Sequence, residues 1–121
     1  MPVSTGSYTP GGMLLGGFPV LTRKVTIASG AGALARGTVL GKITSGGKYK
    51  TSLTASSDGS ETPKRILAEA VDASSGDVVA EVYETGIFDS SKLTIGADHT
   101  VATVNAAFEA ANISMKLVTP A

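Results

Sequence analysis

Apolar and polar residues alternate along much of the chain after residue 20, with the period of two that is typical of half-buried β-strands. Arg23–Ile27 shows this alternation first, and Thr38–Thr44 and Lys48–Leu53 show it again. The last two segments are separated by Ser45–Gly47, which contains a Gly-Gly pair. Because glycine accepts the positive φ of tight turns, this arrangement predicts a β-hairpin.

The middle of the chain predicts further strands separated by polar loops. Ala55–Lys64 is polar and predicts a loop, whereas Arg65–Asp72 predicts a strand or a short helix. Ala73–Asp77 predicts a turn, and the longest strand candidate follows at Val78–Phe88. Gly86 inside that candidate predicts a bulge or a bend.

The period changes near the C-terminus. Thr100–Ala111 predicts a short helix, because its apolar residues recur at i, i+3, i+7 and i+10. Asp98 is the expected N-cap of this helix. Alternation then returns over Ile113–Leu117 and predicts a final strand. The whole pattern predicts a mainly β domain with one short helix, whose apolar face consists of Val101, Val104, Phe108 and Ala111.

The first residues follow neither period. Met1–Gly17 is rich in Gly and Pro and contains no charged side chain. This composition predicts a flexible N-terminal arm over residues 1–17, followed by one domain over residues 18–121. The apolar run Met13–Leu15 would be a liability if it were always exposed. Docking on a partner and packing on its own domain are both open for this run.

Composition narrows the possible classes of protein. The chain has 121 residues, no Cys and no Trp, and Gly, Ala, Ser and Thr make up nearly half of it. The absence of Cys excludes disulfides and thiolate metal sites. A core so poor in large side chains predicts an oligomer, in which subunit contacts add burial. No apolar run approaches the ~18 residues of a membrane-spanning helix, so we expect synthesis in the cytoplasm and no membrane partner.

The formal net charge is zero, but the two halves of the chain differ. Met1–Ser57 contains six Lys and Arg and no acid, hence +6, whereas Asp58–Ala121 contains four basic residues and ten acids, hence −6. A basic half can indicate nucleic-acid binding. These cations are scattered, and Tyr49 is the only aromatic residue between the first and the last of them, so we expect no direct nucleic-acid partner.

One glycine-rich segment matches a nucleotide-binding pattern. Ser29–Ala35 reads SGAGALA and follows a predicted strand. Dinucleotide binding requires a helix to begin here, so that its free N–H groups face the pyrophosphate. The following residues, Arg36–Val39, instead predict another strand, and the acid expected about twenty residues later is missing. The segment therefore favours a flexible loop, and no cofactor is expected.

Two other residues could carry chemistry. His99 is the only histidine, which excludes a His-based metal cluster. His99 next to Asp98 could form an acid–base dyad, but no nucleophile stands out among the many Ser and Thr. Lys116 follows Met115, as in lipoyl- and biotin-carrying domains, yet too few residues follow for the second half of such a domain. We therefore expect no enzyme and no metal site.

Four segments cover most of the chain in a distinctive order. They are Arg36–Tyr49 (RGTVLGKITSGGKY), Asp58–Ser74 (DGSETPKRILAEAVDAS), Val82–Asp89 (VYETGIFD) continuing into Lys92–Thr94, and the helix-to-strand ending Ala107–Met115. In order, spacing and total length they resemble the phage head decoration protein family.

The resemblance implies a β-tulip or β-clip-like fold that assembles as a homotrimer. It implies trimers on the outer surface of the expanded viral head, at (quasi-)three-fold sites, where they clamp the major capsid protein and stabilise the shell. It also implies a virion protein without catalytic activity, whose N-terminal arm orders on the capsid. Under this hypothesis, the basic half faces the capsid and neighbouring subunits. The expected capsid-binding residues of the arm region are Tyr8, Met13, Leu14, Leu15 and Phe18.

Two alternatives stay open at this point. The first is another structural component of the virion, such as a tail, baseplate or fibre-knob protein. The second belongs to a different class, a small non-viral carrier or ligand-binding module. A covalent group on Lys116 or another lysine would favour the second.

Overall fold

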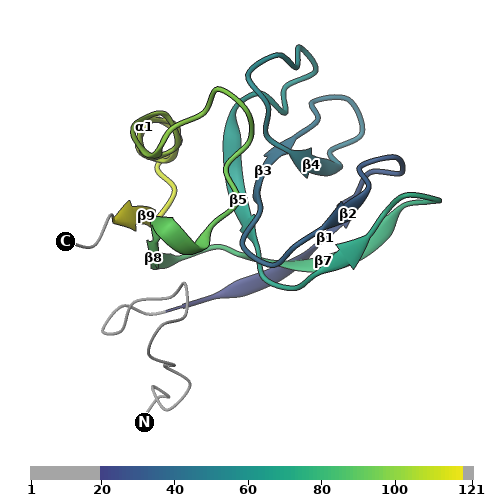
Figure 1. Cartoon of the computed structure of the whole chain (residues 1–121), viewed down its shortest axis with the longest axis horizontal. Coiled ribbons are helices and arrows are strands. Elements are labelled where there is room, and N and C mark those ends of the chain that lie inside the picture. The colour runs from purple at the N-terminus through teal and green to yellow at the C-terminus, as the bar shows by residue number, and fades with distance from the viewer. Residues whose placement is uncertain (1–19, 119–121) are drawn as a thin grey trace, which may run out of the picture.

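The computed structural model describes residues 20–118, which form a mainly β fold with one short helix near the C-terminus (Figure 1). This confirms the fold class that the alternation predicts. The elements are β1 (Thr22–Ile27), β2 (Ala33–Leu34), β3 (Val39–Lys42), β4 (Tyr49–Thr51), β5 (Pro63–Leu67), β6 (Val71–Asp72), β7 (Val78–Tyr83), β8 (Gly86–Asp89), the 3₁₀ turn η2 (Ser90–Lys92), α1 (Val101–Ala110) and β9 (Met115–Val118).

Five strands close into a small barrel in the order β1-β4-β3-β5-β7. β1 pairs antiparallel with β7 along its whole length, from Thr22 opposite Tyr83 to Ile27 opposite Val78. On its other side, β1 meets β4 at one parallel pair, Ile27 opposite Tyr49. The barrel therefore closes through a narrow seam between β1 and β4.

The predicted hairpin joins β3 to β4. Gly46 and Gly47 have φ of 92° and 73°, values that glycine adopts without strain. The loop over residues 55–62 passes across β3 at Gly41, where an added Cβ would overlap the Ser60 carbonyl. This loop can therefore cover the barrel only because residue 41 has no side chain.

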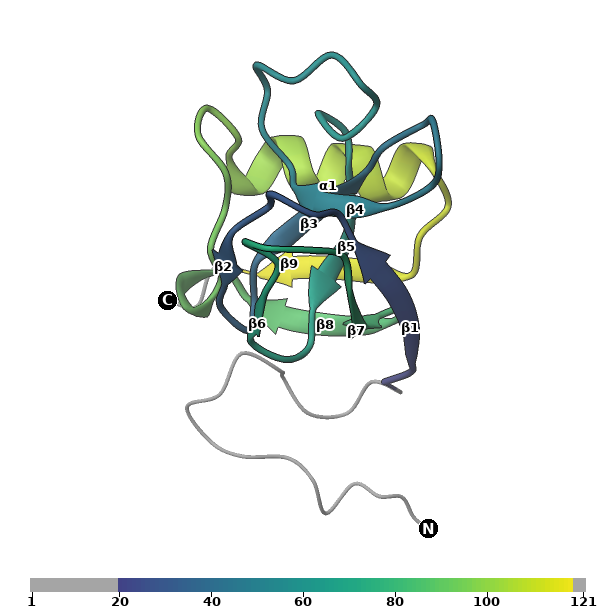
Figure 2. The same ribbon diagram turned by 90° about the vertical axis from the view of Figure 1, so that its right-hand side faces the viewer.

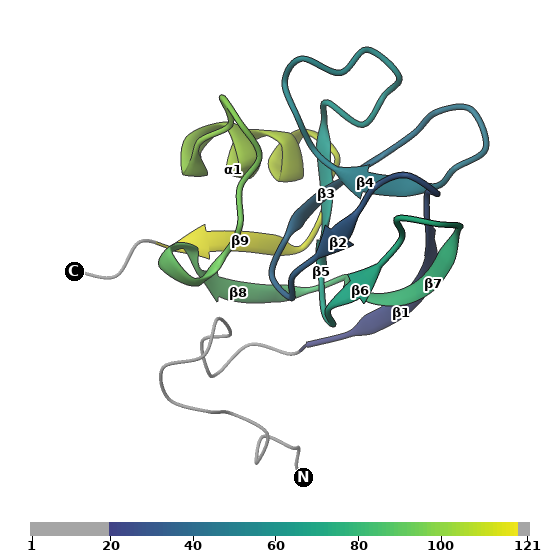
Figure 3. The same cartoon turned by 45° about the vertical axis from the view of Figure 1, so that its right-hand side comes forward.

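The C-terminal segment forms a second unit beside the barrel. β8 pairs in parallel with β9, and α1 packs against β9 and β5. Figures 2 and 3 show α1, β9 and β8 stacked one above another on one side of the molecule. Asn105 of α1 makes two hydrogen bonds to the backbone of Leu117. Its Oδ1 accepts from the Leu117 N–H at 2.8 Å, and its Nδ2 donates to the Leu117 carbonyl at 2.9 Å.

The buried apolar side chains form two clusters. The helix cluster lies between α1 and the strands beneath it, and the barrel cluster fills the five-stranded barrel. The helix cluster consists of Val39, Ile66, Tyr83, Phe88, Val104, Phe108, Met115 and Leu117. The barrel cluster consists of Ile27, Leu34, Leu40, Tyr49, Leu67, Ala73, Ala80 and Val82.

Two predicted strands are divided in the structure. The segment 78–88 forms β7 in the barrel and β8 in the C-terminal sheet, because the chain bends at Gly86, whose φ is 147°. Gly86 therefore confirms the predicted bend, although the prediction of one continuous strand was wrong. The segment 65–72 adopts the strand alternative but breaks into β5 and β6.

The prediction of Asp98 as N-cap was wrong. Thr100 caps α1, with its side-chain oxygen accepting from the Thr103 N–H, while the Thr103 hydroxyl accepts from the Thr100 N–H. This reciprocal pair satisfies two backbone donors at the helix start. Asp98 lies before the cap with φ of 68°. Ala111 follows the helix and is exposed, so the buried positions of α1 are Val104 and Phe108.

Candidate functional site

The residues expected to contact the capsid all lie outside the described part of the chain: Tyr8, Met13, Leu14, Leu15 and Phe18. Their role and the boundary of the predicted arm at residue 17 stay predictions. The described residues define where this segment joins the fold.

The described chain begins with two exposed apolar residues. Val20 is 40% and Leu21 is 58% exposed. The Leu21 N–H donates to Thr85 Oγ1 at 2.9 Å, and its carbonyl accepts from the Glu84 N–H at 2.7 Å. These bonds fix the N-terminal junction against the turn between β7 and β8. Both side chains leave apolar surface exposed at this junction.

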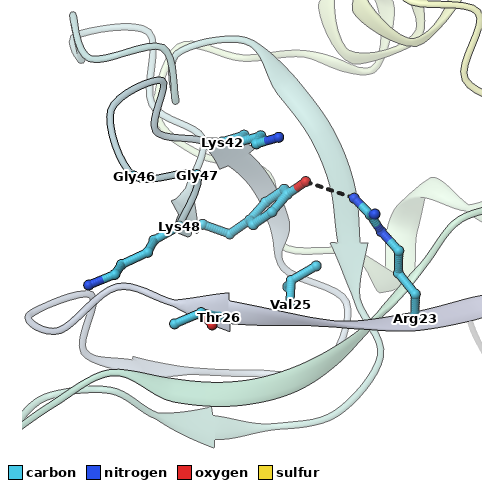
Figure 4. A pocket seen from close by; sticks show the side chains of 8 residues that line it. Arg23, Val25, Thr26, Lys42, Gly46, Gly47 and Lys48 are labelled. Carbon is cyan, nitrogen blue, oxygen red and sulfur yellow. Dashed lines mark hydrogen bonds between the residues drawn. The ribbon is translucent and has the colours of Figure 1, made fainter.

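A polar pocket opens at the barrel seam. One guanidinium nitrogen of Arg23 donates to the Tyr49 hydroxyl at 3.2 Å across the gap between β1 and β4. Figure 4 shows Lys42 extending from the hairpin toward the side where Arg23 lies, whereas Lys48 extends the opposite way. The pocket has a volume of about 270 Å³, and Gly46 of the hairpin turn also lines it. Three cations therefore surround a small opening in the barrel wall.

Three ion pairs join the basic half of the sequence to the acidic half. Arg23 Nε lies 3.3 Å from Glu84 Oε2, and Lys48 Nζ lies 2.6 Å from Asp77 Oδ2. The third pair joins Lys50 Nζ to a carboxylate oxygen of Asp58 at 3.1 Å. The fold therefore interleaves the two halves, and no uniformly basic face follows from the charge difference along the sequence.

Hydrogen bonds lower the pKa of two of these acids. A hydrogen bond from Lys48, followed in size by one from the Ser29 N–H, lowers the pKa of Asp77. The hydroxyl and the N–H of Ser60 are the main cause that lowers the pKa of Asp58 to about 2. Both carboxylates therefore stay charged at neutral pH.

His99 connects three segments through its ring. Nε2 lies 2.9 Å from the Glu61 carbonyl and 3.2 Å from Ser52 Oγ, while Nδ1 lies 3.1 Å from Thr103 Oγ1. A carbonyl only accepts, so Nε2 carries the proton and cannot take one from Ser52. Ser52 is also fully buried. The histidine thus links loop 55–62 to the end of β4 and the start of α1.

The other candidate motifs take structural positions. The glycine-rich segment 29–35 begins no helix and contains β2, which pairs with β6. Lys116 is an exposed residue of β9. Residues 20–118 contain no group of three His, Cys, Asp or Glu that could hold a metal ion. In the same range, no helix has the length and apolar character that crossing a bilayer requires.

Comparison with protein families identifies the chain. Residues 3–114 match the family model for the bacteriophage lambda head decoration protein D, which covers nearly the whole chain. The chain belongs to the head decoration protein family. A search among curated proteins gave no significant match.

Membership of the head decoration protein family identifies the general role of the chain. Proteins of this family are structural components of the phage capsid, so this chain is a capsid decoration protein. The match includes the region of Tyr8, Met13, Leu14, Leu15 and Phe18. It therefore extends across the junction at Val20 into the described fold.

The pocket at the seam of this head decoration protein is not evident in the sequence. Arg23 and Tyr49 come from different predicted strands, and alternation alone does not show which strands pair. The presence of Lys42 and Lys48 on either side of a Gly-Gly turn was the available clue. The Ile43 N–H donates to the Lys48 carbonyl at 2.7 Å, so the turn holds both lysines at the same end of the hairpin, where both line the pocket.

Proposed function

We propose that this decoration protein binds the outer surface of the expanded head as homotrimers at (quasi-)three-fold sites, where it clamps neighbouring major capsid protein subunits. The family match over residues 3–114 carries the proposal. A trimer that binds only the expanded lattice stabilises that lattice by mass action. No chemical step is needed for such a role.

The trimer is supported by what a single chain leaves exposed. Leu21 is 58% exposed and lies next to the exposed Val20 at the N-terminal junction. Val79 of β7 is 63% exposed. Contacts between subunits or with the capsid would remove this apolar surface from water. Three subunits would also present three N-terminal arms, so that attachments after the first become effectively intramolecular.

The arm is proposed to bind by adding an extended segment to a sheet edge of the capsid. In this mode, main-chain hydrogen bonds supply affinity and pockets accept apolar side chains. Met13, Leu14 and Leu15 are the proposed anchors, flanked by Tyr8 and Phe18. Ordering such a segment costs about 1–2 kcal/mol per residue, so it should settle only where an edge and pockets are present.

The direct test adds purified protein to expanded, undecorated heads and images them by electron microscopy. We expect trimeric density at the three-fold positions over the whole head. The mass of the protein bound at each position should correspond to three chains. Density confined to one vertex would contradict the proposal and favour a tail component. Mass spectrometry of the native protein checks the carrier alternative, which a covalent group on Lys116 would support.

A truncation tests the arm separately. A chain without Met1–Leu15 should keep its circular dichroism spectrum and thermal transition, because the described fold begins after it. Its binding to expanded heads should be much weaker than that of the full chain. Equal affinity of the two chains would show that the arm contributes nothing.

A further inference from the structure

The barrel seam leaves most of one strand edge without a partner strand. β1 pairs with β7 on one side through all six residues, but with β4 only at Ile27 opposite Tyr49. Within residues 20–118, no other strand pairs with the second edge of β1. The side-chain bond from Arg23 to the Tyr49 hydroxyl is the contact that spans this gap.

Cations surround the gap. The pocket at the seam shares Lys42 in its lining with a second pocket of about 390 Å³. The second pocket adds Lys64 of β5. We name the two pockets together the basic groove, whose cationic residues are Arg23, Lys42, Lys48 and Lys64.

Two of these cations are uncompensated. Arg23 and Lys48 form ion pairs with Glu84 and Asp77. Among the described residues, the side-chain ammonium groups of Lys42 and Lys64 have no hydrogen-bond partner and form no ion pair. The basic groove thus contains two cations that are paired with acids and two that are not. The resulting local excess of positive charge attracts an anionic group.

We propose that the basic groove receives an extended, carboxylate-bearing segment of the capsid subunit, an inference that rests on the proposed function. The unpaired backbone edge of β1 suits an extended peptide, which can add hydrogen bonds along it. Lys42 and Lys64 supply partners for acidic side chains on that peptide. The groove is formed by a different part of the chain from the N-terminal arm, because its lining residues lie in the barrel strands and the loops that join them.

The chemistry of the groove favours carboxylates over nucleic acid. Glu84 and Asp77 already pair with Arg23 and Lys48, so the groove has two unpaired cations and no continuous row of cations for a phosphate backbone. Single-stranded nucleic acid is usually held by exposed aromatic side chains that stack with the bases. The only aromatic residue in the lining is Tyr49, which is 3% exposed.

The test compares two double variants with the same change in charge. The first, Lys42→Gln/Lys64→Gln, removes the unpaired cations of the basic groove. The control, Lys92→Gln/Lys116→Gln, removes two exposed lysines that line neither pocket. We expect the first variant to bind expanded heads about tenfold more weakly at low salt, and the control to bind like the unmodified protein. The difference should shrink as salt rises, because screening weakens exposed charge pairs.

A conservative variant separates charge from folding. Lys42→Arg/Lys64→Arg keeps both charges and should keep the affinity within about twofold of the unmodified protein. Thermal unfolding of each variant checks that the barrel is intact. Loss of binding in the arginine variant, with an intact barrel, would contradict a contact based on charge.

Several results would overturn the proposal. If the two glutamine variants bound expanded heads with equal affinity while the unmodified protein also bound, the proposed role of the groove would be wrong. The proposed function would still stand. If the unmodified protein failed to bind heads, both the role of the groove and the proposed function would be contradicted. A changed oligomeric state of Lys42→Gln/Lys64→Gln in sedimentation would assign the groove to a second copy of this chain. Salt-dependent binding of a DNA oligonucleotide that this variant loses would assign it to nucleic acid.

Discussion

The helix cluster and the barrel cluster contain similar numbers of buried residues, but the side chains that fill them differ in size. The helix cluster includes Phe88, Phe108 and Tyr83, and the Tyr83 and Phe88 rings lie 5.1 Å apart in a tilted arrangement. The barrel cluster contains Ala73 and Ala80, and its one aromatic residue is Tyr49. Aromatic pairs add stabilisation beyond the area they bury. The C-terminal unit is therefore held mainly by side-chain volume.

The barrel depends more on polar contacts at its margins. Its seam has one strand pair and one side-chain bond, and its β3–β4 end is covered by a loop held by Asp58 and Ser60. By contrast, Asn105 occupies both backbone groups of Leu117 in the C-terminal unit. An edge with satisfied backbone groups does not recruit another strand. Among the described strands, β1 therefore leaves most of one edge unpaired at the seam, whereas Asn105 satisfies the Leu117 position of β9.

The largest effect is expected in the helix cluster. Phe108→Ala removes a fully buried ring and should lower the free energy of unfolding by about 3–5 kcal/mol. Leu67→Ala is the matched change in the barrel, at a residue that is also fully buried, and should cost less, about 2–3 kcal/mol. Urea unfolding of both variants measures the two values. A larger cost for Leu67→Ala would show that side-chain volume does not distinguish the halves.

The next effect concerns the protected strand of the C-terminal unit. Asn105→Ala leaves the N–H and carbonyl of Leu117 without their partners, at a residue that is 2% exposed. Leaving buried backbone groups unpaired should cost about 1–3 kcal/mol. Glu109→Ala, at an exposed position of the same helix, is the control and should change stability little. Similar losses in both variants would mean that the Asn105 bonds are unimportant.

A smaller effect tests the seam. Tyr49→Phe removes the hydroxyl that accepts from Arg23, and Tyr83→Phe removes the hydroxyl that accepts from Arg36 at 3.1 Å. Each change should cost about 0.5–1 kcal/mol of global stability. Only Tyr49→Phe should also speed hydrogen exchange of the β1 amides, because β1 has one pair with β4. Equal exchange in both variants would show that the seam does not depend on the Arg23 bond.

Sequence patterns predicted the parts of this fold that local chemistry determines. The hairpin at Gly46–Gly47, the bend at Gly86 and the helix over residues 101–110 all follow from local backbone preference or period. Strand pairing was not accessible, because alternation identifies a buried face but not the neighbouring strand. The division of 78–88 between two sheets and the seam at Tyr49 both depend on pairing.

The candidate site was only partly predictable for the same reason. The +6 and −6 halves were evident in the sequence, but ion pairs such as Arg23–Glu84 join residues far apart along the chain.

The N-cap of α1 shows a different limit of prediction from sequence. Asp98 and Thr100 both suit a cap, and the positive φ of Asp98 places it outside the helix start.

The smallest expected effect is a pH dependence at the polar cover of the barrel. Hydrogen bonds from the Ser60 hydroxyl and N–H, and then from Lys50, lower the pKa of Asp58 from 3.8 to about 2. A pKa that is lower in the folded state means that the ionised form is stabilised by folding. This contribution is fully present above pH 3.8 and is lost as the pH falls through about 2. The stability difference between the unmodified protein and Asp58→Asn should therefore vanish over this range.

Asp89, at the end of β8, provides the matched carboxylate outside the barrel. Hydrogen bonding to Ser91 lowers its pKa too, but Asp89 begins the 3₁₀ turn η2 and covers no part of the barrel. NMR titration should show the Ser60 amide moving with a midpoint near pH 2, together with the Thr44 amide, which donates to the Asp58 carbonyl. In Asp89→Asn both amides should titrate unchanged, because that carboxylate does not hold the loop. If both amides still moved with a midpoint near pH 2 in Asp58→Asn, acid would be loosening the whole molecule, and the polar cover would not be a feature of the barrel alone.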